Sequence, residues 1–225
     1  MPRHTIVHTM NAFVPDAPLW AATLIQSRRT TLPKRLCGPG PDETHKRLIL
    51  EAAAAAPDHD QILPWRFVEI PATGRAALGQ AFEDALVDRD PAATADERTQ
   101  AREKAMRAPW LLLAIARTGG APDDIPAHER LLSAGAAIQN MLLMATALGL
   151  GSSLTSGKAM GSAALRQRLG LTDAEVALCF VNIGHIRDAR KERDRPVPAR
   201  FFSTWDPGAH ASHSQIRAEK PQNLA

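Results

Sequence analysis

The sequence predicts an α+β fold, and three observations lead to this prediction. Predicted helices outnumber predicted strands, without the strict alternation of strand and helix that a doubly wound parallel sheet requires. No internal repeat is evident. The longest predicted helix, residues 129–148, is apolar nearly all round, as expected of a central helix buried on several sides. A length of 225 residues fits one compact domain with short extensions.

Two helices are predicted in the first quarter of the chain. Asp16 and Pro18 mark the start of the first helix, which ends near Ser27. Its single apolar stripe consists of Leu19, Trp20, Leu24 and Ile25. After a stretch rich in Pro and Gly, Asp42 caps a second helix that Pro57 terminates.

The next elements are a strand, two helices and a second strand. The first strand covers residues 66–70, and turn-forming residues from Pro71 to Gly74 end it. Two helices with polar faces are expected at 75–88 and 92–107. Residues 110–116 are continuously apolar and too few for a helix, which indicates a fully buried strand.

After the central helix, Gly149 and Gly151 break the helical pattern. A short helix is expected at 161–169 and another buried strand at 176–183. The predicted organisation is an N-terminal extension at 1–15, one domain at 16–205 and a disordered tail at 206–225.

Charge and cysteine content narrow the class of protein. There are 27 Lys and Arg against 24 Asp and Glu, and a net charge of +3 is too small for a nucleic-acid site. Cys37 and Cys179 form neither a disulfide framework nor a CxxC motif. No signal-peptide pattern or membrane-length apolar run is visible. We therefore expect a cytoplasmic protein without nucleic-acid or membrane partners.

The segment GLGSSL at 149–154 superficially resembles a dinucleotide-binding fingerprint. That fingerprint needs a preceding strand, a following helix and a small residue where Leu154 stands. Here a helix precedes the segment, and a strand is expected to follow. The glycines are better explained by a helix cap and by close approach of the backbone to another group.

Two other motifs carry polar side chains. Ser27-Arg28-Arg29-Thr30 could hold a phosphate with several charge-assisted hydrogen bonds, or it could be a solvated basic helix end. Asp58-His59-Asp60 suggests a metal site, but three adjacent side chains cannot all face one ion, so we expect no metal. No pattern typical of zinc hydrolases or catalytic triads is present.

Taken together, three segments resemble the nitroreductase family. They are S-R-R-T after the first helix, A-P-D-H-x-x-x-x-P-W-R-F after the second, and A-G-A-A-I-Q-N-M-L-L-M-A-T-A-L-G-L-G-S followed by T-S-G. They occur in this order over about residues 16 to 200. The resemblance is greatest to the small, single-domain branch with P-D-H in the second motif.

The resemblance implies a mixed sheet surrounded by helices, with a long central helix, in a domain-swapped homodimer that binds two FMN molecules at its interface. It also implies reduction of nitroaromatics, quinones or similar acceptors by NADH or NADPH, with the flavin supplying the redox chemistry and no catalytic side chain. The implied contacts are Arg28, Arg29 and Thr30 to the phosphate and ribityl chain, His59 and Gln61 to the flavin, Leu154, Thr155 and Ser156 approaching the ring from the partner subunit, and Arg193 and Arg195 closing on the phosphate.

Two positions depart from the family pattern and leave alternatives open. Leu63 stands where most members have Gln, and Leu32 stands where a common variant places Lys near the flavin. Three basic residues could replace that lysine: Lys34, Arg35 and Lys158. One alternative is a reductase of an aldehyde, an enone or a carbon–halogen bond on the same fold. Another is a flavin-binding protein without efficient turnover.

Overall fold

The computed structural model describes residues 16–122, 124–188 and 194–205. The predicted extension at 1–15 and the predicted tail at 206–225 lie outside these residues. The chain divides into two units, Met1–Arg190 and Lys191–Ala225. The expected domain end at 205 therefore falls inside the second unit.

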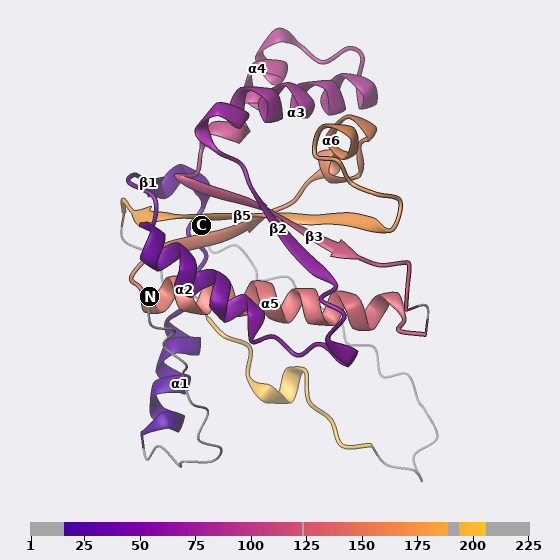
Figure 1. The fold of residues 1–225 in the computed structure, drawn as a ribbon. Coiled ribbons are helices and arrows are strands. Elements are labelled where there is room, and N and C mark those ends of the chain that lie inside the picture. Colours follow the sequence, from indigo (N-terminus) through magenta and orange to yellow (C-terminus); the bar gives the residue numbers. More distant parts are fainter. Residues whose placement is uncertain (1–15, 123, 189–193, 206–225) are drawn as a thin grey trace, which may run out of the picture. The chain divides into compact units, whose positions relative to one another are not determined.

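The helices and strands follow the predicted order (Figure 1). The helices are α1 (Ala17–Ser27), α2 (Glu43–Ala54), α3 (Arg75–Arg89), α4 (Ala95–Glu103), α5 (Ala127–Ala147) and α6 (Ala163–Arg168). The strands are β1 (Leu36–Cys37), β2 (Trp65–Glu69), β3 (Trp110–Arg117), β4 (Gly151–Thr155) and β5 (Glu175–Ile186). The short strand β1 was not expected, and β5 extends beyond the predicted strand at both ends.

One five-stranded sheet forms the centre of the first unit. Its order is β1-β5-β3-β2, and β4 also pairs with β5. All pairs of named strands are antiparallel, and the parallel component of the expected mixed sheet is a bridge between Thr30 and Ser152. This bridge joins the end of the first helix to β4.

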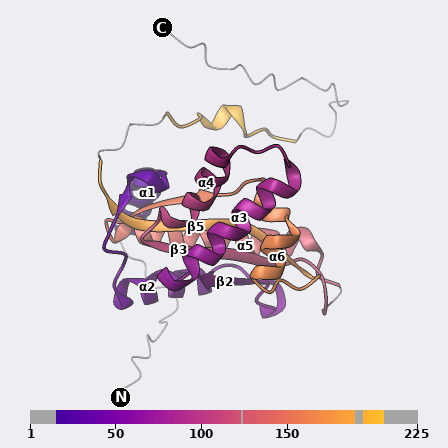
Figure 2. The ribbon, with the colours of Figure 1, turned by 90° about the horizontal axis from the view of Figure 1, so that it is seen from above.

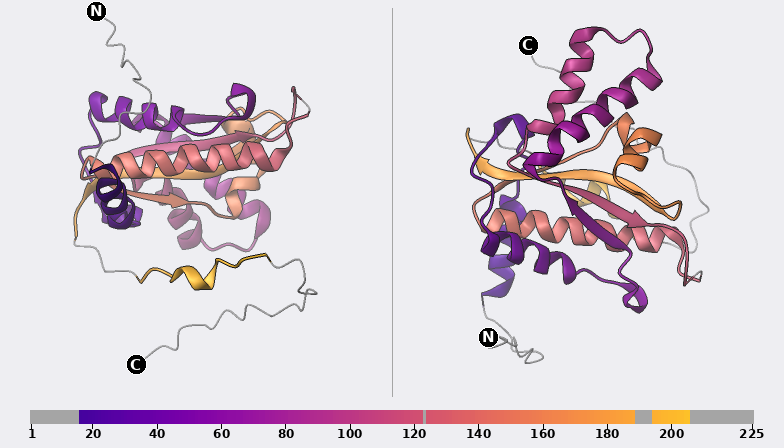
Figure 3. Two further views of the ribbon diagram at one scale, coloured as in Figure 1. Left: turned by 90° about the horizontal axis from the view of Figure 1, so that it is seen from below. Right: turned by 45° about the horizontal axis from the view of Figure 1, so that its top comes forward.

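Two hydrophobic cores lie on opposite faces of the sheet. Alternate residues of β3 enter them: Leu112 packs in the core with α2 and α5, whereas Leu113 packs in the core with α3. Figures 1 and 2 show α3, α4 and α6 on one side of the strands, and Figure 3 shows α2 beside α5 on the other. The first seven residues of β3 are buried, so the predicted fully buried strand is confirmed.

The glycines after α5 have the structural roles predicted for them. Gly149 has φ +73°, its N–H donates to Thr146 O, and the N–H of Leu150 donates to Ala145 O, which is the Schellman pattern. A Cβ on Gly151 would lie 2.8 Å from a methyl carbon of Leu36. The first glycine therefore ends the helix, and the second lets β4 approach β1.

A buried carboxylate joins α3 to α4. The Glu83 side chain is 3% exposed and forms ion pairs with Arg98 and Arg102, whose hydrogen bonds lower the pKa of Glu83. Gly79 on α3 allows the backbones to meet, since a Cβ there would lie 2.9 Å from the carbonyl oxygen of Arg102. The two helices thus form a fixed hairpin on one face of the sheet.

We expect Gly79→Ala to destabilise the protein by about 1–3 kcal/mol, because the added methyl group forces two backbones apart. Chemical denaturation followed by circular dichroism measures the change. Gln80→Ala, at the exposed neighbouring position, is the matched control and should stay within about 0.5 kcal/mol of the wild type. Equal stability of the two variants would contradict the tight approach of α3 and α4.

In the second unit, residues 194–205 contain one 3-10 turn, Pro198–Arg200. Val197, Phe201, Phe202 and Trp205 are all exposed there. No helix within the described ranges is both long and apolar enough to cross a membrane.

Candidate functional site

The predicted phosphate-binding segment lies against β4. Arg28 caps the end of α1, and two residues later the chain pairs with β4, where Thr31 N–H donates to Ser152 O at 2.8 Å. The Arg29 guanidinium donates to the carbonyl oxygens of Gln26 and Arg28 through one of its nitrogens. The segment is therefore held at the edge of the sheet by the β4 backbone.

Hydroxyl groups without hydrogen-bond partners lie on this segment and on the strand that it pairs with. Thr31, Ser152 and Ser153 are each 2% exposed, and their side-chain oxygens have no hydrogen-bond partner among the described residues. Buried polar atoms are normally hydrogen-bonded. Thr31 and Ser152, whose backbones are hydrogen-bonded, and the arginines of the same segment are side chains of the kind that bind an oxyanion such as phosphate.

The predicted ring contacts continue along the same strand. Leu154 is 44% exposed, Thr155 Oγ1 accepts a hydrogen bond from Asn182 Nδ2 at 3.0 Å, and Ser156 follows directly. Four residues of extended chain, about 13 Å, separate Ser152 from Ser156. The resemblance assigned Leu154, Thr155 and Ser156 to the partner's side of the ring, and in this chain they follow Ser152, the residue that Thr30 bridges.

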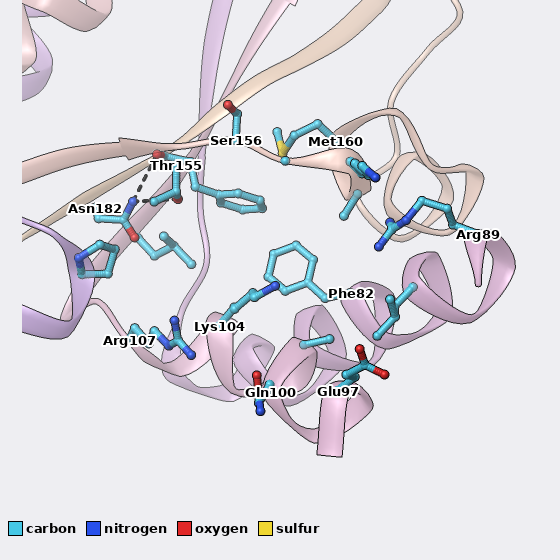
Figure 4. A pocket seen from close by; sticks show the side chains of 18 residues that line it. Phe82, Arg89, Glu97, Gln100, Lys104, Arg107, Thr155, Ser156, Met160 and Asn182 are labelled. Atoms are coloured by element: carbon cyan, nitrogen blue, oxygen red, sulfur yellow. Dashed lines mark hydrogen bonds between the residues drawn. The ribbon is translucent and has the colours of Figure 1, made fainter. Parts of the chain in front are cut away.

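Thr155 and Ser156 open onto a cavity of about 590 Å³ (Figure 4). Its other walls come from the α3–α4 hairpin, from β5 and from the 3-10 turn Lys158–Gly161. Of the three basic residues considered as replacements for the lysine absent at position 32, Lys158 lines this cavity, and Lys34 and Arg35 do not. The volume is within the usual range for small-molecule sites.

The second predicted motif forms a strained loop. Asp60, Gln61 and Leu63 have φ values of +54°, +54° and +48°. Non-glycine residues in this region cost about 1–3 kcal/mol each and concentrate at functional sites. Two hydrogen bonds that involve side chains fix the loop, from Leu63 N–H to Asp58 Oδ2 at 2.8 Å and from Arg117 to Ile62 O at 2.6 Å. Gln61 and Leu63 are thereby presented at the surface.

His59 begins this loop and pairs with α5. Its Nδ1 lies 2.7 Å from Glu129 Oε2, and the Asp60 carboxylate lies 4.0 Å from its Nε2. The hydrogen bond with Glu129, followed by the charge of Asp60, raises the pKa of His59 above its usual 6.5. Asp58 is engaged with Leu63 rather than with His59, so the three residues of the motif do not converge on one point.

We expect the ring of His59 to titrate above pH 6.5 in the folded protein, and Glu129→Gln to return its pKa toward 6.5. Because the folded-state pKa is raised, the pair stabilises the fold below pH 6.5, and this stabilisation is lost as the pH rises through the folded-state pKa. NMR titration of the imidazole measures both values. An unchanged His59 pKa in Glu129→Gln would contradict the pairing.

The two predicted halves of the site lie far apart in one chain. Thr30 bridges Ser152, just beyond the C-terminal end of α5, whereas His59 pairs with Glu129 in its first turn. This helix has 21 residues and is about 30 Å long. A single FMN molecule is shorter than this, so it cannot contact both motifs of one chain.

Of the last two predicted cofactor contacts, Arg193 and Arg195, the structure describes only the second. Arg193 lies outside the described residues, and Arg195 belongs to the second unit. Cys179 is buried, which raises the pKa of its thiol to about 11 and makes it a poor nucleophile. In the part of the chain that is described, no group of three His, Cys, Asp or Glu side chains could hold a metal ion.

Known protein families and solved structures match most of this chain. A family model described as the nitroreductase family matches residues 25–185, which include the β4 segment, the strained loop and α5. The chain belongs to the nitroreductase family. Membership places it among oxidoreductases.

Individual nitroreductases match most of the chain. A Haemophilus influenzae protein named "Putative NAD(P)H nitroreductase" is 28% identical over 185 residues, 82% of this chain and 98% of that protein. A nitroreductase-like protein from Bacillus cereus has a TM-score of 0.70 and 20% identity, covering 88% of this chain and 99% of its own. An FMN and NADPH-dependent nitroreductase from "sphigopyxis sp. strain HMH" has a TM-score of 0.65 and 19% identity, and the match covers 83% of this chain and 99% of that chain. These structural matches confirm the nitroreductase fold.

Proposed function

We propose that this nitroreductase is an FMN-dependent enzyme that transfers electrons from NAD(P)H to a small organic acceptor. The observation that carries the proposal is the bridge that sets the segment of Arg28 and Arg29 against β4, a strand that carries buried hydroxyls without hydrogen-bond partners and leads to the cavity. The solved relative named as FMN and NADPH-dependent supports the same cofactor.

The residues present fit FMN. Arg28, Arg29 and Thr30 would hold the phosphate and ribityl chain, and Thr155 and Ser156 would contact the ring where they line the cavity. When bound, FMN would supply the redox chemistry by accepting a hydride from NAD(P)H and delivering two electrons to the acceptor. With a quinone, the balanced reaction converts NAD(P)H, a proton and the quinone into NAD(P)⁺ and the hydroquinone.

The chain's own groups would bind, orient and shield the cofactor. The strained loop would present His59 and Gln61 to a flavin held by another subunit, since its own phosphate segment is too distant. We assign His59 to flavin contact rather than obligatory proton donation, because solvent can protonate the product. Its exposure of 57% is consistent with access for water.

A second copy of this chain would complete the site. No residue of α1 is buried, and large apolar side chains are exposed on α1 and on the first turns of α5. These side chains are Leu19, Trp20, Ile25, Leu131 and Leu132. We propose that both groups of exposed apolar side chains are covered in the homodimer interface, which also brings the loop of one subunit to the β4 segment of its partner.

The purified protein tests the proposal directly. It should be yellow, release FMN on denaturation and lose its flavin absorbance near 450 nm, a wavelength typical of oxidised flavins, when NAD(P)H is added anaerobically. Quinone, nitroaromatic, enone and halogenated acceptors should then be compared for reoxidation. Bound flavin that NAD(P)H does not bleach would instead favour a flavin-binding protein without turnover, and a colourless protein that binds no added FMN would reject the proposal.

A further inference from the structure

The cavity next to β4 is lined mainly by positive charge. Four cationic side chains line it, Arg89, Lys104, Arg107 and Lys158, against one carboxylate, Glu97. Glu97 is occupied by the N-terminal cap of α4, where one of its oxygens accepts hydrogen bonds from Thr94 N and Oγ1, both at 2.9 Å. The lining therefore carries an excess of three positive charges.

These cations differ from the other arginines of the same hairpin. Arg98 and Arg102 are both neutralised by the buried Glu83. Lys104, Arg107 and Lys158, by contrast, have no carboxylate within ion-pair distance among the residues that the structure describes. A concave surface of one charge concentrates field lines and attracts ligands of the opposite charge.

The floor of the cavity is aromatic and apolar. The rings of Phe82 and Phe180 meet edge to face, with centroids 5.5 Å apart and an interplanar angle of 87°. Met160 lines the same space, and Figure 4 shows Lys104 beside the Phe82 ring with Arg107 on the same wall. Such a surface packs well against a planar apolar body whose charged end reaches the cations.

We infer that the preferred acceptor is a small aromatic anion whose charged group binds Lys104 and Arg107 while its ring packs against the contacting pair Phe82 and Phe180. The two cations stand three residues apart, on the 3-10 turn after α4 and at its C-terminal cap, so one carboxylate can contact both. The inference rests on the proposed function, because Thr155 and Ser156 would place the flavin at this same cavity. Beyond the proposed function, the inference specifies the charge and the shape of the preferred substrate.

The test compares 4-nitrobenzoate with 4-nitrobenzamide, which share a nitro group and a similar shape but differ in charge. The ratio of their kcat/KM values is measured with NAD(P)H and saturating FMN for the wild type and for the double variant Lys104→Gln/Arg107→Gln. Relative to the wild type, the double variant should shift this ratio against the anion at least tenfold, mainly through KM. Arg168→Gln, an exposed arginine outside the cavity, should leave the ratio unchanged.

A binding measurement separates this inference from the proposed function. Calorimetry on the FMN-loaded, oxidised protein should show benzoate binding at least tenfold more tightly than benzamide, and 0.5 M salt should reduce the difference. The double variant should lose the difference and keep its FMN affinity. If the double variant kept the preference for benzoate, the two cations would not bind the anion, and the inference would be overturned. If the double variant instead lost FMN affinity, the cations would bind the cofactor, which would also overturn the inference. Failure to reduce even the neutral nitrobenzamide would count against the proposed function, while the benzoate titration would still decide the charge preference.

Discussion

Replacing both arginines of the phosphate segment, Arg28→Ala/Arg29→Ala, is expected to weaken FMN binding by about two to four orders of magnitude. Each charge-assisted contact to a phosphate contributes about 1.5–3 kcal/mol, or roughly ten- to a hundredfold in affinity, and the two losses act on the same group. Fluorescence titration of the apoprotein with FMN measures the change. Because neither guanidinium is buried, the fold should be retained.

Riboflavin provides a control for this prediction, since it has the same ring system without the phosphate. Its affinity should change far less than that of FMN in the double variant. If FMN and riboflavin lost affinity equally, the arginines would act through the local fold. Unchanged FMN affinity would remove both arginines from the site.

The variant Leu132→Asp is expected to convert the protein to a monomer that no longer retains FMN. Leu132 is 71% exposed on α5, among the apolar side chains proposed to lie in the dimer interface, and a carboxylate buried there would be unpaired. Stable dimers of this kind bury more than roughly 2,000 Å², so loss of the interface also removes the partner's half of each site. Analytical ultracentrifugation and the FMN content after gel filtration give the two readouts.

Gln167→Asp introduces the same charge at an exposed position on α6, across the sheet from α5, and should leave both the dimer and the FMN content unchanged. A Leu132→Asp protein that stays dimeric would show that α5 is not at the interface. A monomer that keeps its FMN would show that one chain is sufficient for binding.

The regular elements could be predicted because local patterns specify them. The continuous apolar run of β3 reflects burial on both faces, and the glycines after α5 reflect a cap and a close contact, as the structure confirms. The two-residue strand β1 has no such pattern, because only its pairing with the end of β5 defines it. The extension of β5 to Ile186 follows from the same pairing.

The candidate site could be predicted only in part, because its geometry depends on contacts between distant segments. A motif suggests that Arg28 and Thr155 serve one cofactor, but only the fold shows that the segment after α1 bridges the strand that carries Thr155. The cationic wall of the cavity had no local signal. Lys104 and Lys158 are 54 positions apart in the sequence, and the packing of the α3–α4 hairpin over the sheet brings them to one cavity.

Complementation between two chains that each lack one half of the site tests most directly the central claim, that each flavin is held by the phosphate segment of one subunit and the strained loop of the other. One chain carries Arg28→Ala/Arg29→Ala, the second carries His59→Ala/Gln61→Ala, and the mixed dimer is purified with two different affinity tags. If the site is shared, one of the two sites in the mixed dimer is wild type in both halves, so tight FMN binding at about half a molecule per chain is expected, with NAD(P)H-dependent bleaching. If both motifs of one chain served the same flavin, every site in the mixed dimer would carry a defect. A mixed dimer that binds FMN no better than either parent dimer would therefore contradict the shared site.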